Sequence, residues 1–148
     1  MAAFDYRQAQ EIHAAFAQTG VKYLFIGKCG AILLGFPDTT QDADVFVEKS
    51  RENGLAIVEA LERLGFALGD ENKSEIVRGK DFVQLKNGPF DLDLIFAPDG
   101  IERFEDAWAR REEIDGFPVC SIEDIIESKR ASGRQKDKES LPRLISFS

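Results

Sequence analysis

The sequence predicts an α/β fold of the α+β kind: a mixed β-sheet of about five strands with helices packed mainly on one face. Three observations support this prediction. Residues 23–47 show the pattern of a strand, a glycine turn, a short helix, a loop and a second strand. The dipeptide Asn87-Gly88 indicates a hairpin between two further strands. Segments with the apolar spacing of helices flank these strands.

The first half of the chain alternates helices and strands. A first helix is expected to begin after the capping residue Asp5 and to end at Gly20. A buried strand follows over residues 23–26, and a short helix over 30–34. The loop 35–41 leads into a strand over 43–47. A longer helix, starting at Ser50 or Arg51, continues to residue 64.

The second half contains less regular patterns. A short strand is expected near Phe66, and the polar stretch GDENKSE that follows predicts a loop. The Asn87-Gly88 turn joins strands over 82–86 and 90–96, and a helix is expected over 101–110. Asp115-Gly116 suggests another hairpin or a short edge strand. A helix capped by Ser121 should end near residue 133, and residues 141–145 add a final helical turn.

Length and composition restrict the class of protein. The 148 residues are expected to form a single domain with a real core. A net charge of −8 argues against broad DNA binding, since nucleic-acid phosphates repel an acidic surface. The chain has neither a signal-peptide pattern at its start nor an apolar run of membrane-spanning length. Cys29 and Cys120 form no CxxC motif, so a cytoplasmic location is expected.

Two pairs of carboxylates stand at the starts of predicted strands. Asp42 and Asp44 share one face of their strand, about 7 Å apart along it, and Asp91 and Asp93 repeat this spacing on a later strand. Aspartate is disfavoured in strands, and binding of Mg²⁺ or Mn²⁺ would explain its presence. Metal ions held by such acids support phosphoryl transfer. The alternative is a solvated acidic rim. If the pairs meet, Asp44 and Asp93 should lie on one face within about 6 Å.

Glycines and a basic segment add two weaker signals. Gly27 and Gly30 surround the start of a short helix, where free backbone N–H groups attract phosphate, although both glycines could serve close packing alone. The basic segment KRASGRQKDK begins at Lys129 in an otherwise acidic chain. It is either a solvated helix end or a contact for an anionic ligand. In the second case Lys129, Arg134 or Lys136 should lie near the mouth of the cleft.

The stretch from Gly27 to Asp44 resembles the nucleotidyltransferase superfamily, which has the DNA polymerase beta-like fold. The shared pattern is an apolar strand, a glycine, a helix, and Asp-x-Asp on the next strand, with a third acid on a later strand. The tail SIEDIIESKRASGRQKDKESLPRL resembles the end of many small prokaryotic members. The resemblance covers most of the chain and implies a nucleotidyltransferase-like fold.

The resemblance implies roles for particular residues. Asp42, Asp44 and Asp93 would be metal ligands, and Asp93 would also take the proton of the attacking hydroxyl. Asp91 is the alternative for that last role. The residues implied in nucleotide binding are Gly27, Lys28, Thr39 and Thr40.

Two hypotheses follow. The first is an enzyme that transfers a nucleoside monophosphate from a nucleoside triphosphate such as ATP to a hydroxyl of a protein, RNA or small molecule. The second is an inactive binding module of the same fold, such as the antitoxin-like partner of a toxin–antitoxin system. Lys28 replaces a small residue of the family pattern and Asp38 a basic one. These departures favour the binding module, whereas the three acids favour the enzyme.

Overall fold

A computed structural model describes residues 3–148, apart from the side chain of Lys136. This part of the chain forms six strands and seven helices. The strands are β1 Tyr23–Phe25, β2 Ala43–Val47, β3 Phe82–Leu85, β4 Leu92–Ile95, β5 Glu112–Ile114 and β6 Phe117–Val119. The helices are α1 Tyr6–Thr19, α2 Gly27–Leu33, α3 Arg51–Leu64, α4 Asp70–Arg78, α5 Phe104–Ala109, α6 Ile122–Ser132 and α7 Gln135–Phe147.

The strands form one mixed sheet in the order β3-β4-β2-β1-β6-β5. The central strands β1 and β2 are antiparallel, while β2 and β4 are parallel. Two hairpins, β3–β4 and β5–β6, complete the two edges of the sheet. The predicted mixed sheet is confirmed, with six strands instead of about five.

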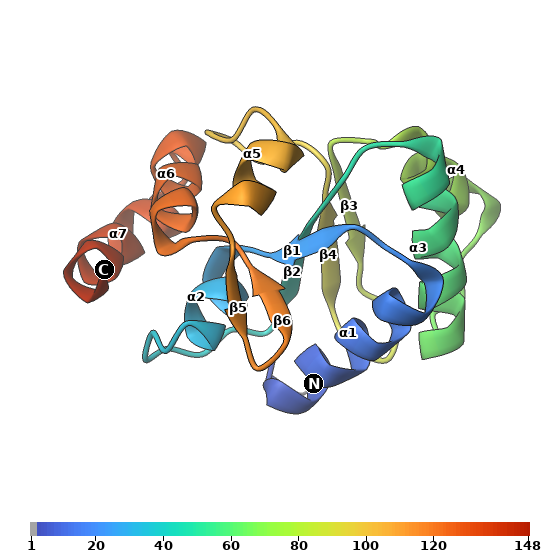
Figure 1. Cartoon of the computed structure of the whole chain (residues 1–148), viewed down its shortest axis with the longest axis horizontal. Coiled ribbons are helices and arrows are strands. Elements are labelled where there is room, and N and C mark those ends of the chain that lie inside the picture. The colour runs from blue at the N-terminus through green and yellow to red at the C-terminus, as the bar shows by residue number, and fades with distance from the viewer. Residues whose placement is uncertain (1–2) are drawn as a thin grey trace.

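Helices lie on both faces of this sheet (Figure 1). On the first face α1 and α3 pack side by side, and α4 packs on α3. On the second face lie α5 and α6, with α7 packed against α6. The sequence predicted helices mainly on one face, and the structure adds α5, α6 and α7 on the second face. Helices α6 and α7 lie at the opposite end of the molecule from α4.

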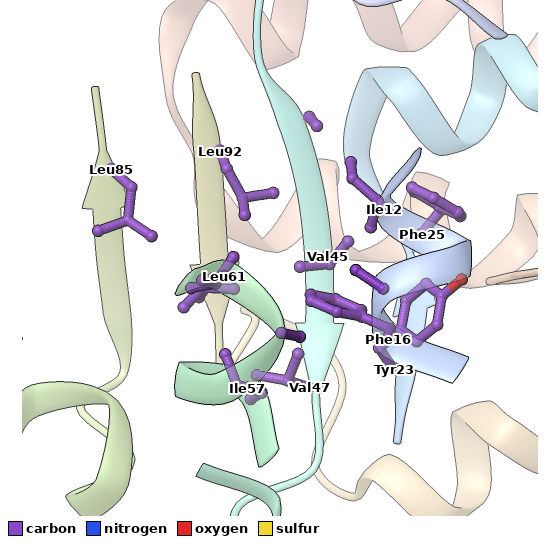
Figure 2. Packing of buried hydrophobic residues seen from close by; sticks show 14 of the residues in the cluster. Ile12, Phe16, Tyr23, Phe25, Val45, Val47, Ile57, Leu61, Leu85 and Leu92 are labelled. Atoms are coloured by element: carbon purple, nitrogen blue, oxygen red, sulfur yellow. The ribbon is translucent and has the colours of Figure 1, made fainter. Parts of the chain in front are cut away.

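The larger hydrophobic cluster lies between the first face and its helices. Figure 2 shows Ile12 and Phe16 of α1 and Ile57 and Leu61 of α3 beside apolar side chains of the strands. All four side chains are fully buried. A smaller cluster on the second face contains Leu24, Phe46 and Ile125. Because both faces of the central strands are covered, β1 is buried along its whole length.

The predicted helix caps are confirmed. The backbone N–H of Gln8 donates to Asp5 Oδ1 at 2.9 Å, and α1 ends at Gly20 with φ of 76°. Ser50 and Ser121 cap α3 and α6 in the same way, each at 3.1 Å. These local signals are readable in the sequence because each cap satisfies N–H groups only three residues away.

Two expectations for the irregular regions were wrong, and a third was incomplete. The polar stretch predicted as a loop forms α4, and Phe66 is not in a strand. This helix is mostly polar in composition, and it buries one side chain, that of Ile76, where it packs on α3. The final turn is instead the full helix α7, which runs through Pro142. Packing against α6 outweighs the interruption of its hydrogen bonding by proline.

No helix among the described residues has the length and apolar character needed to cross a membrane. Cys29 and Cys120 are both free and buried.

Candidate active site

Asp44 and Asp93 are direct partners in the parallel pairing of β2 with β4. Both side chains line one cavity on the second face of the sheet. The two residues are cross-strand neighbours, and the charge of Asp93 acts on the Asp44 carboxyl. The predicted meeting of the two carboxylate-bearing strands on one face is therefore confirmed.

This contact changes the protonation of both acids. Burial, together with the neighbouring charges of Asp93 and Asp42, raises the pKa of Asp44 well above its usual range. Burial also raises the pKa of Asp93, and the charge of Asp42 adds to the effect. Asp93 Oδ1 is buried and has no hydrogen-bond partner within residues 3–148. The Asp44–Asp93 pair is thus short of neutralising positive charge, and it also lacks a hydrogen-bond donor at Asp93 Oδ1 among the described residues.

The two other acids of the predicted pairs differ in their surroundings. Asp42 also lines the cavity, and its Oδ1 lies 4.0 Å from Lys86 Nζ at the rim. Asp91 is buried outside the cavity lining, and its Oδ1 lacks a hydrogen-bond partner among the described residues. The Asp91 backbone carbonyl accepts from Ala43 N–H at 3.0 Å. The Asp91 backbone therefore links the start of β4 to β2. Of the two acids Asp91 and Asp93, it is Asp93 that lines the cavity.

Gly27 stands directly beside the carboxylate pair at the start of α2. Its φ of 66° is left-handed, and a Cβ at this position would overlap Asp44 Oδ2. A Cβ on Gly30 would stand 3.1 Å from the carbonyl oxygen of Phe25 and 3.2 Å from Ile125 Cδ1. Both glycines therefore permit close packing, and Gly27 does so against the Asp44 carboxylate itself.

The two departures from the family pattern form one ion pair. Lys28 Nζ lies 3.4 Å from Asp38 Oδ2, and Arg143 of α7 lies 3.4 Å from the same oxygen. Lys28 and Thr40 line the cavity, whereas Thr39 lies outside its lining and donates its backbone N–H to Asp38 Oδ1 at 2.7 Å. Asp38 therefore holds the Lys28 ammonium at the side of the cavity.

The basic tail contributes residues to the lining of the same cavity as the carboxylate pair. Lys129 and Arg134 both line it, as predicted; the side chain of Lys136 lies outside the described part of the structure. Both cations contact Asp137, at 3.3 Å from Lys129 and 3.0 Å from Arg134. Ser132 Oγ donates to the same carboxylate at 2.6 Å. The charge of Lys129 also acts on Asp44 and favours its ionised form.

Asp137 is a site residue that the sequence-based prediction did not single out. Its carboxylate is 4% exposed and touches three side chains of the cavity wall. The only signal for this role in the sequence is that Asp137 directly follows several basic residues. Phe82 and Gln84 of β3 were also missed, and they line the cavity because their register places them beside Ile95 and Asp93. The cavity measures about 470 Å³.

The donor set fits a hard divalent cation at two of the three predicted ligands. Asp44 and Asp93 supply adjacent carboxylate oxygens, including the unpartnered Oδ1 of Asp93. Within residues 3–148 no group of three acidic, histidine or cysteine side chains already converges as a metal site. Asp42, the predicted third ligand, acts on both acids through its charge. Asp44 and Asp93 are thus a pair of adjacent carboxylates in the lining of the cavity.

Comparison with solved structures identifies two similar molecules. A Thermotoga maritima protein assigned to the nucleotidyltransferases is 15% identical, with a TM-score of 0.60, and the match covers 96% of this chain and 92% of that one. The lincosamide antibiotic adenylyltransferase LnuA, solved with lincomycin bound, is 16% identical, with a TM-score of 0.67 and coverage of 99% and 100%. No protein-family model and no curated protein matches the sequence. The similarity over nearly the whole of each chain shows that this protein has a nucleotidyltransferase-like fold.

Proposed function

We propose that this protein is a nucleotidyltransferase, which moves a nucleoside monophosphate from a nucleoside triphosphate to a hydroxyl acceptor. The observation that carries the proposal is that Asp44 and Asp93, paired across β2 and β4, line one cavity together with Lys129 and Arg134. A cavity lined by both acids and cations suits a substrate with a polyphosphate chain. The fold shared with an adenylyltransferase is consistent with this reaction.

The residues divide the work of the reaction. The acceptor hydroxyl attacks the α-phosphorus, its proton passes to Asp93, and the bond to the bridging oxygen breaks to release pyrophosphate. Lys129 and Arg134 bind the departing phosphates, and Asp137 orients both cations. Gly27 leaves room for the Asp44 carboxylate at the start of α2. Burial of Asp93, which is 6% exposed, limits the access of water to its carboxyl.

A divalent ion, Mg²⁺ or Mn²⁺, belongs to the same proposal. Asp44 and Asp93 would hold it, and Asp42 would be the third ligand from the rim. When bound, such an ion neutralises phosphate charge and stabilises the charge that develops during transfer. The raised pKa values of Asp44 and Asp93 support this assignment because the pair gains most from an added positive charge.

The experiment that tests the proposal measures ligand-dependent melting. Wild-type protein should melt at a higher temperature with millimolar Mg²⁺ and ATP than without them, following ordinary ligand linkage. Asp44→Asn should lose this rise and most nucleotidyl transfer, since each tenfold loss of rate needs only about 1.4 kcal/mol of barrier. Asp99→Asn is a matched control because Asp99 is an exposed acid of the same cavity lining.

The alternative proposal is an inactive, antitoxin-like binding module. Wild-type protein that shows no rise in melting temperature with Mg²⁺ and ATP would overturn the enzyme and favour this alternative. An equal loss in Asp44→Asn and Asp99→Asn would show that cavity charge in general, and not the Asp44–Asp93 pair, binds the ligand.

A further inference from the structure

A basic surface adjoins the cavity on the side away from α6 and α7. Two shallow depressions form it, and both contain Lys49 and Arg78. The basic side chains that line the depressions are Lys49, Arg51, Lys73, Arg78 and Lys80. The single acid in either lining is Asp81, among the described residues. We call these five residues the basic track. It concentrates positive charge in a chain whose net charge is −8.

Three cations of the track carry charge that no nearby acid neutralises. Lys73 pairs with Glu62 at 3.2 Å, and Lys80 pairs with Glu75 at 3.1 Å. Within residues 3–148, Lys49, Arg51 and Arg78 form no salt bridge, and all three side chains are exposed. The screening length at physiological salt is about 8 Å, so an anion at this surface responds mainly to the charges directly beside it, which include these three cations.

Close packing holds these like charges together. A Cβ on Gly54 of α3 would stand 2.7 Å from Val77 Cα, so this glycine lets α3 and α4 approach. A Cβ on Gly79 would stand 2.7 Å from Lys49 Cγ, so the Lys49 stem lies across Gly79, between Arg78 and Lys80 in sequence. Arg51 is the first residue of α3, where the helix dipole disfavours a cation. An anionic partner bound at this surface would offset the repulsion among these cations.

The track is continuous with the carboxylate cavity. Asp81 and Phe82 line both the cavity and the first depression. Phe82 starts β3, is 39% exposed, and points to the same face as Asp93. An exposed aromatic ring beside cations is a platform on which a nucleic-acid base can stack. The surface therefore offers phosphate contacts and one stacking site that leads toward the reacting acids.

The second group of cations lies on the other side of the acids. Lys129 and Arg134 belong to the α6–α7 wall, and α7 and α4 stand at opposite ends of the long axis in Figure 1. A triphosphate bound at Lys129 and Arg134 leaves the basic track open. One cavity with cations on both sides thus suits two polyanionic substrates, one from each side.

We infer that the acceptor of this enzyme is the end of a single-stranded polynucleotide, which lies on the basic track, stacks a base on Phe82 and presents its terminal hydroxyl to Asp93. This inference rests on the proposed nucleotidyl transfer for its chemistry, while binding of the strand can be measured without any reaction. A short local track also agrees with the absence of broad DNA binding expected from the net charge.

The test measures fluorescence anisotropy of a labelled 12-nucleotide single-stranded RNA, with no nucleotide or metal present. Wild-type protein should bind it, and the variant Lys49→Gln/Arg51→Gln/Arg78→Gln should bind at least tenfold more weakly. For this variant, the slope of log affinity against log salt concentration should fall in magnitude by about 2, because each of the three lost phosphate contacts contributes about 0.7. Phe82→Leu should weaken binding several-fold with an unchanged salt slope, because it removes stacking alone.

A matched control removes the same charge elsewhere. Arg7, Arg103 and Arg130 are exposed and each pairs with a neighbouring glutamate, so Arg7→Gln/Arg103→Gln/Arg130→Gln should keep wild-type affinity within about twofold. A DNA strand of the same sequence shows whether the protein distinguishes ribose from deoxyribose. Equal binding of DNA and RNA, or preference for RNA, both support a strand-binding track. The inference is overturned by equal losses in the two triple variants, by no RNA binding at 50 mM salt, or by poly-glutamate displacing the RNA at equal charge concentration. Strand binding without nucleotidyl transfer would overturn the proposed reaction and leave the track intact.

Discussion

The thiol of Cys29 is hydrogen-bonded to the backbone of Asp44. The Asp44 N–H donates to Cys29 Sγ at 3.1 Å, and the thiol donates toward the carbonyl oxygens of Asp44 and Ile26 at 3.3 and 3.2 Å. Cys29 is fully buried on α2. Its side chain therefore connects α2 to Asp44, the residue of β2 whose carboxylate lines the cavity.

Removal of this thiol should loosen Asp44. Cys29→Ala leaves the buried Asp44 N–H without its partner and should lower the free energy of unfolding by about 1–3 kcal/mol. Cys29→Ser keeps a donor and an acceptor and should lose less stability and less nucleotidyl transfer than Cys29→Ala. Urea denaturation and initial rates measure the two effects. If both variants lose equally, the loss comes from cavity volume and not from the hydrogen bonds.

Alanine at Gly27 should damage the site more than alanine at another left-handed glycine. Gly27→Ala combines a positive φ with overlap on Asp44 Oδ2, whereas Gly20 has φ of 76° and no heavy atom within 4 Å of its built Cβ. The backbone strain of about 1–2 kcal/mol is common to both. Gly27→Ala should therefore be the less stable variant and should lose Mg²⁺-dependent stabilisation, which Gly20→Ala keeps. Thermal melts that shift equally in the two variants would contradict the contact with Asp44.

The stabilising effect of Asp137 should depend on pH. Burial alone would raise the pKa of Asp137, but the Ser132 hydrogen bond and the charges of Lys129 and Arg134 outweigh it and lower this pKa. A carboxyl with a lowered folded-state pKa stabilises the fold above its unfolded pKa, and the contribution is lost as the pH falls through the folded value. Asp137→Asn should therefore unfold about 1–3 kcal/mol more easily at pH 7.

The difference between Asp137→Asn and wild type should shrink as the pH falls below about 4, the ordinary range of an aspartate. Denaturant titrations between pH 3 and pH 7 measure this convergence. Asp99→Asn, at an exposed acid of the same cavity, should differ little from wild type throughout. A constant difference for Asp137→Asn across this range would mean that its carboxylate charge is not what stabilises the wall.

Lys28 should contribute little to the stability of the fold, and its side chain should not obstruct nucleotide binding. The Lys28–Asp38 pair is partly exposed, so a double-mutant cycle with Lys28→Gln and Asp38→Asn should give a coupling of about 0.2–1 kcal/mol. Lys28→Ser restores the small residue of the family pattern and should bind ATP about as tightly as wild type, since Asp38 holds the ammonium aside. Much tighter ATP binding by Lys28→Ser in calorimetry would show that the lysine obstructs the site.

Several features of this protein follow from its sequence by itself. The spacing of Asp42 and Asp44 places both on one face, because side chains alternate along any strand. The helix caps at Asp5, Ser50 and Ser121 are equally local, since each cap satisfies an N–H three residues away. Such signals need no knowledge of distant parts of the chain, which is why the elements around them were predicted correctly.

The tertiary structure alone decided which of these residues meet. Asp44 reaches Asp93 through the register of β2 with β4, and Cys29 reaches Asp44 through the packing of α2 against β2. Helix α4 is mostly polar and packs on α3, and its last residue, Arg78, lies beside Lys49 in two shallow depressions. Strand register and helix packing are determined by the burial of side chains that are far apart in sequence. Periodicity within one segment therefore cannot predict them.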